Sequence, residues 1–155
     1  MKDILTQGLA QLDITPPPEA MDQLCRYAQL LVEQNKVMNL TAITDPEGIA
    51  RLHFLDSAAL LPLCGGAAGK SLIDVGTGAG FPGLVLKILC PELKLTLLDS
   101  LGKRVNWLSQ VARELGLPIL ARLPIDPALA AACDAGKVEG AERNYLEELA
   151  AQLDR

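Results

Sequence analysis

The chain has 155 residues, of which half are apolar and 3% aromatic, and its net charge is −5. This is enough apolar material for one domain with a buried core. The acidic balance excludes an overall basic surface for nucleic acid, and the scarcity of aromatic residues excludes a platform that stacks bases of single strands. A local basic patch for an RNA presented by a larger particle stays open. The four cysteines form no C-x-x-C pair, so no metal site and no redox pair is predicted.

The first 65 residues predict helices. Apolar side chains at positions 4, 5, 9 and 12 indicate a short helix that the prolines at 16–18 end. A second helix, which we expect to end at Asn35 and Lys36, has an apolar stripe formed by Met21, Leu24, Cys25, Ala28, Leu31 and Val32. Residues 44–47 combine a capping side chain with a proline, which predicts a third helix. Its expected apolar face is Ile49, Leu52, Leu55 and Ala59.

Residues 71–89 predict a strand, a glycine turn and a helix. The run 71–75 is short and apolar, residues 76–83 are rich in glycine, and residues 83–89 are suited to a helix. The turn reads G-x-G-x-G, and Phe81 stands where the dinucleotide fingerprint G-x-G-x-x-G requires its last glycine. This pattern is typical of a turn that holds a cofactor over its bare backbone.

Two acidic residues favour one class of cofactor. A pyrophosphate on this turn would meet the Asp74 carboxylate, whereas a cationic group would be attracted to it. A second apolar run, 93–98, ends in Asp99, at the place where an acid can accept hydrogen bonds from a ribose. An adenosyl ligand with a cationic amino acid and no phosphate suits both acids. We therefore expect S-adenosylmethionine as cofactor, with NAD as the second choice.

A competing phosphate motif lies just upstream. Residues 64–71 nearly spell the phosphate loop G-x-x-x-x-G-K-S but lack its first glycine. They also precede a strand, whereas a phosphate loop follows a strand and opens a helix. We interpret this segment as a linker.

The remaining segments complete the expected organisation. Residues 105–115 have helical spacing, 119–120 hint at a third strand, and 128–132 and 142–153 suggest helices. Strands that alternate with helices imply a parallel sheet with right-handed crossovers. The expected fold class is α/β, with a helical cap at 1–65, a partial Rossmann-like cofactor-binding unit at 66–120 and a helical tail at 121–155.

Four blocks of the sequence, 39–46, 51–57, 74–83 and 98–105, closely resemble the RsmG family, also called GidB. The resemblance covers about residues 1–117. It implies a truncated class I methyltransferase that uses S-adenosylmethionine to methylate a guanine N7 in small-subunit (16S) ribosomal RNA. The turn and the resemblance together predict these cofactor-binding residues: Asp74, Gly76, Thr77, Gly78, Gly80, Phe81, Asp99, Ser100 and Leu101. The resemblance places these residues near the cofactor mouth, as candidates for RNA binding: Asn39, Arg51, His53, Asp56, Ser57, Lys103 and Arg104.

The resemblance stops where family members continue with further strands. Residues 123–139 instead look like the C-terminal end of MinD- or Mrp-like ATPases, whose own nucleotide motif is absent. An alternative function is therefore a non-catalytic module that binds the cofactor or forms homo-oligomers through an exposed sheet edge, because an unpaired apolar edge invites pairing.

No catalytic acid or base is predicted. Guanine N7 already carries a free lone pair, so methyl transfer to it needs alignment and desolvation rather than proton removal. His53, the only histidine, has two interpretations, a substrate contact or a hydrogen-bonded structural residue that Asp56 and Ser57 orient. The N-terminus is no signal peptide and no apolar run is long enough for a membrane, so we expect a cytoplasmic protein that does not contact membranes.

Overall fold

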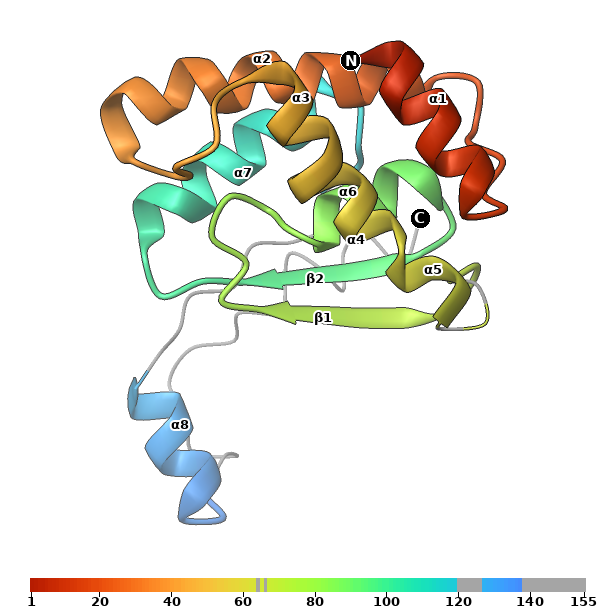
Figure 1. Cartoon of the computed structure of the whole chain (residues 1–155). Helices are drawn as coiled ribbons and strands as arrows, with labels where there is room; N and C mark the ends of the chain where they lie inside the picture. Colours follow the sequence, from red (N-terminus) through yellow and green to blue (C-terminus); the bar gives the residue numbers. More distant parts are fainter. Residues whose placement is uncertain (64, 66, 120–126, 138–155) are drawn as a thin grey trace. The chain divides into compact units, whose positions relative to one another are not determined.

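The computed structural model describes residues 1–63, 65, 67–119 and 127–137 (Figure 1). The chain divides into two compact units, Met1–Gly116 and Leu117–Arg155. The three-part division expected above, with boundaries at 65 and 120, remains a prediction.

Two helices open the first unit. Helix α1 (Lys2–Gln11) buries Leu5 and Leu9, as the apolar spacing predicts. Helix α2 (Ala20–Met38) is longer than predicted, because it continues past Asn35 and Lys36. It ends at Asn39, whose φ of 46° is left-handed, a conformation that Asn adopts more readily than most residues.

The third predicted helix exists but presents a different face. It begins after Asp45, which caps the Gly48 amide, and comprises α3 (Pro46–Gly48), the π-helix η1 (Ile49–Leu55) and α4 (Asp56–Ala58). In a π-helix the repeat lengthens to i+5. The buried positions are therefore Ile49, Ala50, Phe54, Ser57 and Ala58. The predicted face was wrong at Leu52, which is 61% exposed. The short α5 (Leu60–Leu63) follows.

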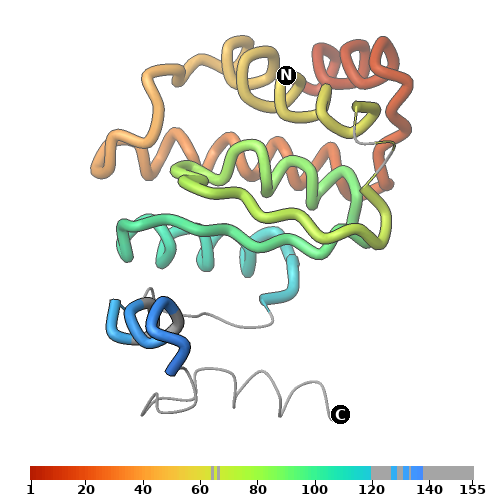
Figure 2. The backbone as a smooth tube through the Cα atoms, turned by 90° about the horizontal axis from the view of Figure 1, so that it is seen from below, coloured from red at the N-terminus to blue at the C-terminus, as the bar shows by residue number. Residues whose placement is uncertain are grey.

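The predicted β-α-β-α unit is confirmed. Strand β1 (Ser71–Val75) and strand β2 (Lys94–Leu98) pair in parallel, with Ser71 opposite Lys94 and Val75 opposite Leu98. Helix α6 (Gly83–Leu89) connects them, and α7 (Gly102–Glu114) follows β2. Figure 2, seen from below, shows the two strands side by side. This arrangement brings the turns after β1 and β2 together at the carboxyl ends of the strands.

The two faces of this sheet differ in burial. Leu95, Leu97 and the Asp74 carboxylate face Gly83 in α6, and in Figure 1 the helices of the unit lie on that side. On the opposite face Ile73 and Val75 are 66% and 73% exposed, and Leu98 is 39% exposed. In the described part of the chain the sheet has two strands, which makes the structure a truncated Rossmann-like unit. The exposed side chains on β1 and β2 leave one face of this sheet open.

The second unit contains one described helix, α8 (Pro127–Asp134), which includes the predicted helical residues 128–132. Ile119 lies in neither a helix nor a strand, and the other half of the suggested third strand, Leu120, is outside the described residues. The helix expected at 142–153 also lies outside them. The likeness of residues 123–139 to ATPase termini remains a prediction.

Candidate functional site

The glycines of the turn after β1 divide into two kinds. Gly76 and Gly78 have φ of 75° and 56°, and a Cβ added to Gly76 would meet no atom within 4 Å. A Cβ added to Gly80 would instead lie 2.5 Å from the Tyr27 hydroxyl. Gly76 and Gly78 therefore leave a bare backbone surface toward the outside, whereas Gly80 permits close packing toward the core.

The turn uses most of its amide groups internally. The amides of Gly76 and Thr77 both donate to the Leu98 carbonyl, at 2.8 and 3.1 Å. The amides of Gly80 and Phe81 donate to the Thr77 carbonyl, and the Gly78 amide donates to Asp99. A phosphate-binding turn needs amides that point at the anion. With these five amides already used, the turn favours a ligand without phosphate.

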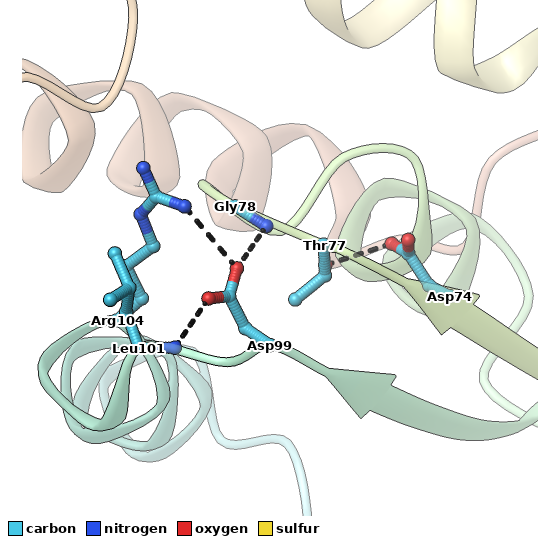
Figure 3. Close-up of polar contacts among 6 residues, drawn as sticks. All are labelled: Asp74, Thr77, Gly78, Asp99, Leu101 and Arg104. Carbon is cyan, nitrogen blue, oxygen red and sulfur yellow. Dashed lines mark hydrogen bonds and ion pairs between the residues drawn. The ribbon is translucent and has the colours of Figure 1, made fainter.

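Asp74 is a buried part of this turn, with 8% exposure. Its Oδ2 accepts a hydrogen bond from the Thr77 hydroxyl at 2.8 Å (Figure 3). The same oxygen accepts a hydrogen bond from the Gly83 amide at 2.9 Å. The carboxylate thus ties the end of β1 to the turn and to the first residue of α6. Its predicted attraction for a cationic ligand group remains a prediction.

Asp99 joins the two strand ends. Its Oδ1 accepts the Leu101 amide at 2.8 Å, and its Oδ2 accepts the Gly78 amide at 2.9 Å and lies 3.5 Å from Arg104 Nη1 (Figure 3). Burial alone would raise the pKa of Asp99, but the two amides and the Arg104 charge outweigh it and lower the pKa. The residue is therefore a carboxylate at neutral pH. Ser100 and Leu101, on the same turn, are exposed.

An aromatic cluster that the sequence analysis missed lies behind the turn. The Tyr27 ring packs 5.5 Å from Phe54, 5.4 Å from Phe81 and 6.4 Å from Trp107. The Tyr27 hydroxyl donates a hydrogen bond to the Ala79 carbonyl. Burial raises the pKa of Tyr27 well above its ordinary value, and the Asp74 charge adds to this, so the hydroxyl remains a donor. The signal available in the sequence was the small number of aromatic residues, which suggests that they pack together in one cluster.

His53 contacts this turn from η1. Its ring stacks on Phe81, with 4.6 Å between centroids and 11° between planes, and its Nε2 lies 2.8 Å from the Thr41 hydroxyl. The Ser57 hydroxyl donates to the His53 backbone carbonyl at 2.5 Å rather than to the ring. The ring is therefore oriented by Thr41 and Phe81, and of the two interpretations this contact set matches the hydrogen-bonded structural histidine.

This environment predicts a pH dependence. Burial lowers the pKa of His53, and the Leu52 backbone and the Asp56 charge oppose it only in part. Between the lowered pKa and about 6.5, the unfolded chain binds a proton that the folded chain does not. We expect the free energy of unfolding to fall as the pH drops below about 7 toward the folded pKa, and His53→Gln to remove part of this fall.

Urea titrations from pH 7.5 to 5.5 measure this effect. Asp56→Asn should steepen the dependence, because it removes a charge that favours the protonated ring. Asp99 does not contribute to this pH dependence, since its lowered pKa changes the free energy of unfolding only in the acid range near and below 4. Identical pH profiles for wild type and His53→Gln would contradict the assignment.

The other predicted RNA-binding residues lie in different settings. Asn39 caps α2, and the side chain of Asn35 holds the following amides of Leu40 and Thr41 at 2.6 and 2.9 Å. Arg51 is exposed and pairs with Glu47 at 2.9 Å. Lys103 and Asp56 are exposed, and Arg104 lies beside Asp99. Their role in RNA binding remains a prediction.

The four sequence blocks nevertheless meet in space. Thr41 from the first block bonds His53 from the second, His53 stacks on Phe81 from the third, and Gly78 of the third bonds Asp99 of the fourth. Contacts between adjacent blocks thus join segments that the sequence separates. They assemble at the carboxyl ends of β1 and β2, where open α/β sheets bind ligands.

Three further observations concern metal binding, membrane spanning and cavities. Among the described residues, no group of three or more His, Cys, Asp or Glu could hold a metal ion. No helix in the described ranges is both long and apolar enough to cross a membrane. A hollow of about 510 Å³ is lined by residues of α1, by residues 13–16 and by Met21, and it shares no residue with the glycine turn.

A strand, a glycine turn, a helix and a second, parallel strand followed by an acid define a Rossmann-like unit, the class of fold in which an acid at this place contacts a ribose. Comparison with known proteins agrees with this class. Residues 20–123 match the family described as GidB, rRNA small subunit methyltransferase G. The chain belongs to this family.

Curated relatives carry the same name. The chain is 48% identical over 116 residues to ribosomal RNA small subunit methyltransferase G of Alkaliphilus metalliredigens, a match that covers 75% of the chain and 48% of that protein. It is 50% identical over 107 residues to the protein of that name from Desulfitobacterium hafniense, and 45% identical over 115 residues to the one from Marinomonas sp.. These matches cover 69% and 74% of the chain, and 44% and 54% of those proteins. The chain spans about half the length of the curated relatives it matches.

Proposed function

We propose that the chain binds S-adenosylmethionine over the turn 76–81, with Asp99 on the ribose, and serves methylation of guanine N7 in small-subunit ribosomal RNA. The observation that carries the proposal is the open backbone surface at Gly76 and Gly78 beside the Asp99 carboxylate. Because five amides of the turn are used internally, this surface suits a nucleoside without phosphate better than it suits NAD.

The chemistry needs little from the protein beyond position. When bound, the cofactor supplies an activated methyl group. Guanine N7 carries a free lone pair, so no side chain has to remove a proton. The ring contacts of Phe81 with Tyr27 and His53 hold one wall of the turn in place. The exposed Lys103 and the partly exposed Arg104 are the proposed contacts for RNA phosphates.

Calorimetry tests the cofactor site. We expect adenosylmethionine and adenosylhomocysteine to bind the wild type, and Asp99→Ala to weaken both by about 1–3 kcal/mol, because a carboxylate–hydroxyl interaction is lost. NAD that binds more tightly than adenosylhomocysteine would refute the assignment.

A labelled-methyl assay tests the activity. With undermethylated small ribosomal subunits as substrate, we expect incorporation at guanine N7 that is slow, because one face of the described sheet is open beside β1. Gly76→Asp should abolish it, since the added side chain would occupy the surface over the turn at a φ of 75°. Equal incorporation by wild type and Gly76→Asp would show that the methyl transfer does not use this turn.

A second candidate, a cofactor-binding or oligomerising module, rests on the same open face. Ile73 and Val75 on β1 are both more than 60% exposed, and exposed apolar strands tend to pair with other chains. Size-exclusion chromatography should then show a dimer or larger species that Val75→Lys disperses. A monomer that does not transfer methyl groups and does not bind adenosylhomocysteine would contradict this candidate.

A further inference from the structure

The Asp99 carboxylate is largely occupied by the protein itself. A carboxylate has about four acceptor positions. The amides of Gly78 and Leu101 take two of them, and the Arg104 guanidinium is directed at Oδ2 as well (Figure 3). A ribose diol brings two hydroxyl donors to an acid in this place. One of the three present partners must therefore leave Asp99 before both hydroxyls can bind it.

Arg104 is the partner that can leave. The two amides donate at 2.9 and 2.8 Å and belong to the backbone of the two turns, which would have to open to release them. The Arg104 contact, at 3.5 Å, is longer than a charge-assisted hydrogen bond. The Arg104 side chain is also 33% exposed, compared with 3% for Asp99, so water can solvate the guanidinium once it withdraws.

We infer that Arg104 is exchanged between two anions: it pairs with Asp99 in the cofactor-free protein, is displaced by the ribose, and then binds a phosphate of the RNA. This inference rests on the proposed function. Arg104 lies in the first turn of α7, next to the exposed Lys103, where the helix N-terminus also favours an anion. Because binding free energies are reciprocal, cofactor and RNA should each strengthen the binding of the other.

The first experiment measures the affinity for adenosylhomocysteine. Arg104→Gln removes the competitor from Asp99, so we expect the variant to bind adenosylhomocysteine about two- to fivefold more tightly than wild type, the range typical of a partly exposed ion pair. A gain in affinity does not arise from a weakened fold. The control is Arg113→Gln, which removes one charge from the last turn of the same helix, about 13 Å along its axis, and should change nothing. Weaker binding by Arg104→Gln, or an equal gain in the control, would overturn the exchange.

The second experiment measures the coupling. Binding to undermethylated small ribosomal subunits is compared with and without saturating adenosylhomocysteine. Wild type should bind the subunits about two- to fivefold more tightly with the ligand, and Arg104→Gln should show no such difference. A wild type that is indifferent to the ligand would overturn the coupling. A wild type that binds no adenosylhomocysteine would instead refute the proposed function itself, so the two failures are distinguishable.

Discussion

Gly80→Ala is expected to destabilise the protein by about 2–5 kcal/mol, or to prevent folding. The left-handed φ of 93° alone costs an alanine about 1–2 kcal/mol. The new Cβ would also lie 2.5 Å from the Tyr27 hydroxyl, 2.7 Å from Leu84 Cδ1 and 2.9 Å from Leu108 Cδ2, and overpacking of this kind costs about 1–3 kcal/mol. Urea unfolding followed by the fluorescence of Trp107, the only tryptophan, measures the difference.

Gly76→Ala is the matched control. It has a similar φ of 75° but meets no atom within 4 Å, so only the backbone term of about 1–2 kcal/mol applies. Tyr27→Phe provides a second check, because it removes the atom nearest to the new Cβ. In the Tyr27→Phe background Gly80→Ala should cost less than in wild type, a non-additivity expected of residues in contact. If Gly80→Ala costs no more than Gly76→Ala, the packing of the turn against α2 is not as described.

The local elements of the cofactor unit could be predicted because they depend on neighbouring residues. Strands β1 and β2 follow from short apolar runs, and α6 follows from a glycine turn that leads into an apolar helix. The parallel pairing then follows, because two neighbouring strands that are joined through a helix lie parallel, and this connection is right-handed. The place of the site at the strand ends was predictable for the same reason.

Side-chain roles were less predictable, because they depend on contacts between distant segments. The spacing of residues 49–59 suggested an α-helical face, but the π-helical repeat turns Leu52 outward and Phe54 inward. Tyr27 did not belong to the predicted stripe of α2, although it reaches the turn at Ala79. Asp99 was predicted as a ribose acceptor, and the structure surrounds it with two amides and Arg104. None of these contacts leaves a periodic signal in the sequence.

Asp74 lies near the proposed cofactor surface and could act either by its negative charge or by holding the turn in place. Asp74→Asn separates these two roles. The asparagine carbonyl can still accept from the Thr77 hydroxyl and the Gly83 amide, while the negative charge disappears. If the charge attracts the sulfonium, Asp74→Asn should weaken adenosylmethionine binding several-fold more than adenosylhomocysteine binding, because only the former carries a sulfonium. If the charge attracts the amino acid ammonium, which both ligands carry, binding of both should weaken several-fold. If the carboxylate only holds the turn, both ligands should lose equally little.

We expect the structural role to dominate, because Asp74 is 8% exposed and its Oδ2 already has two partners. Asp74→Ala should therefore be the damaging substitution. It leaves the buried Gly83 amide without its acceptor, a loss of about 1–3 kcal/mol in stability, and frees the turn that carries the cofactor surface. Thr77→Val is the control, since it removes one hydrogen bond and keeps the other. Calorimetry with both ligands, together with urea unfolding of the three variants, measures these effects. A several-fold loss of affinity in Asp74→Asn, for adenosylmethionine alone or for both ligands, with stability unchanged, would establish attraction by charge instead.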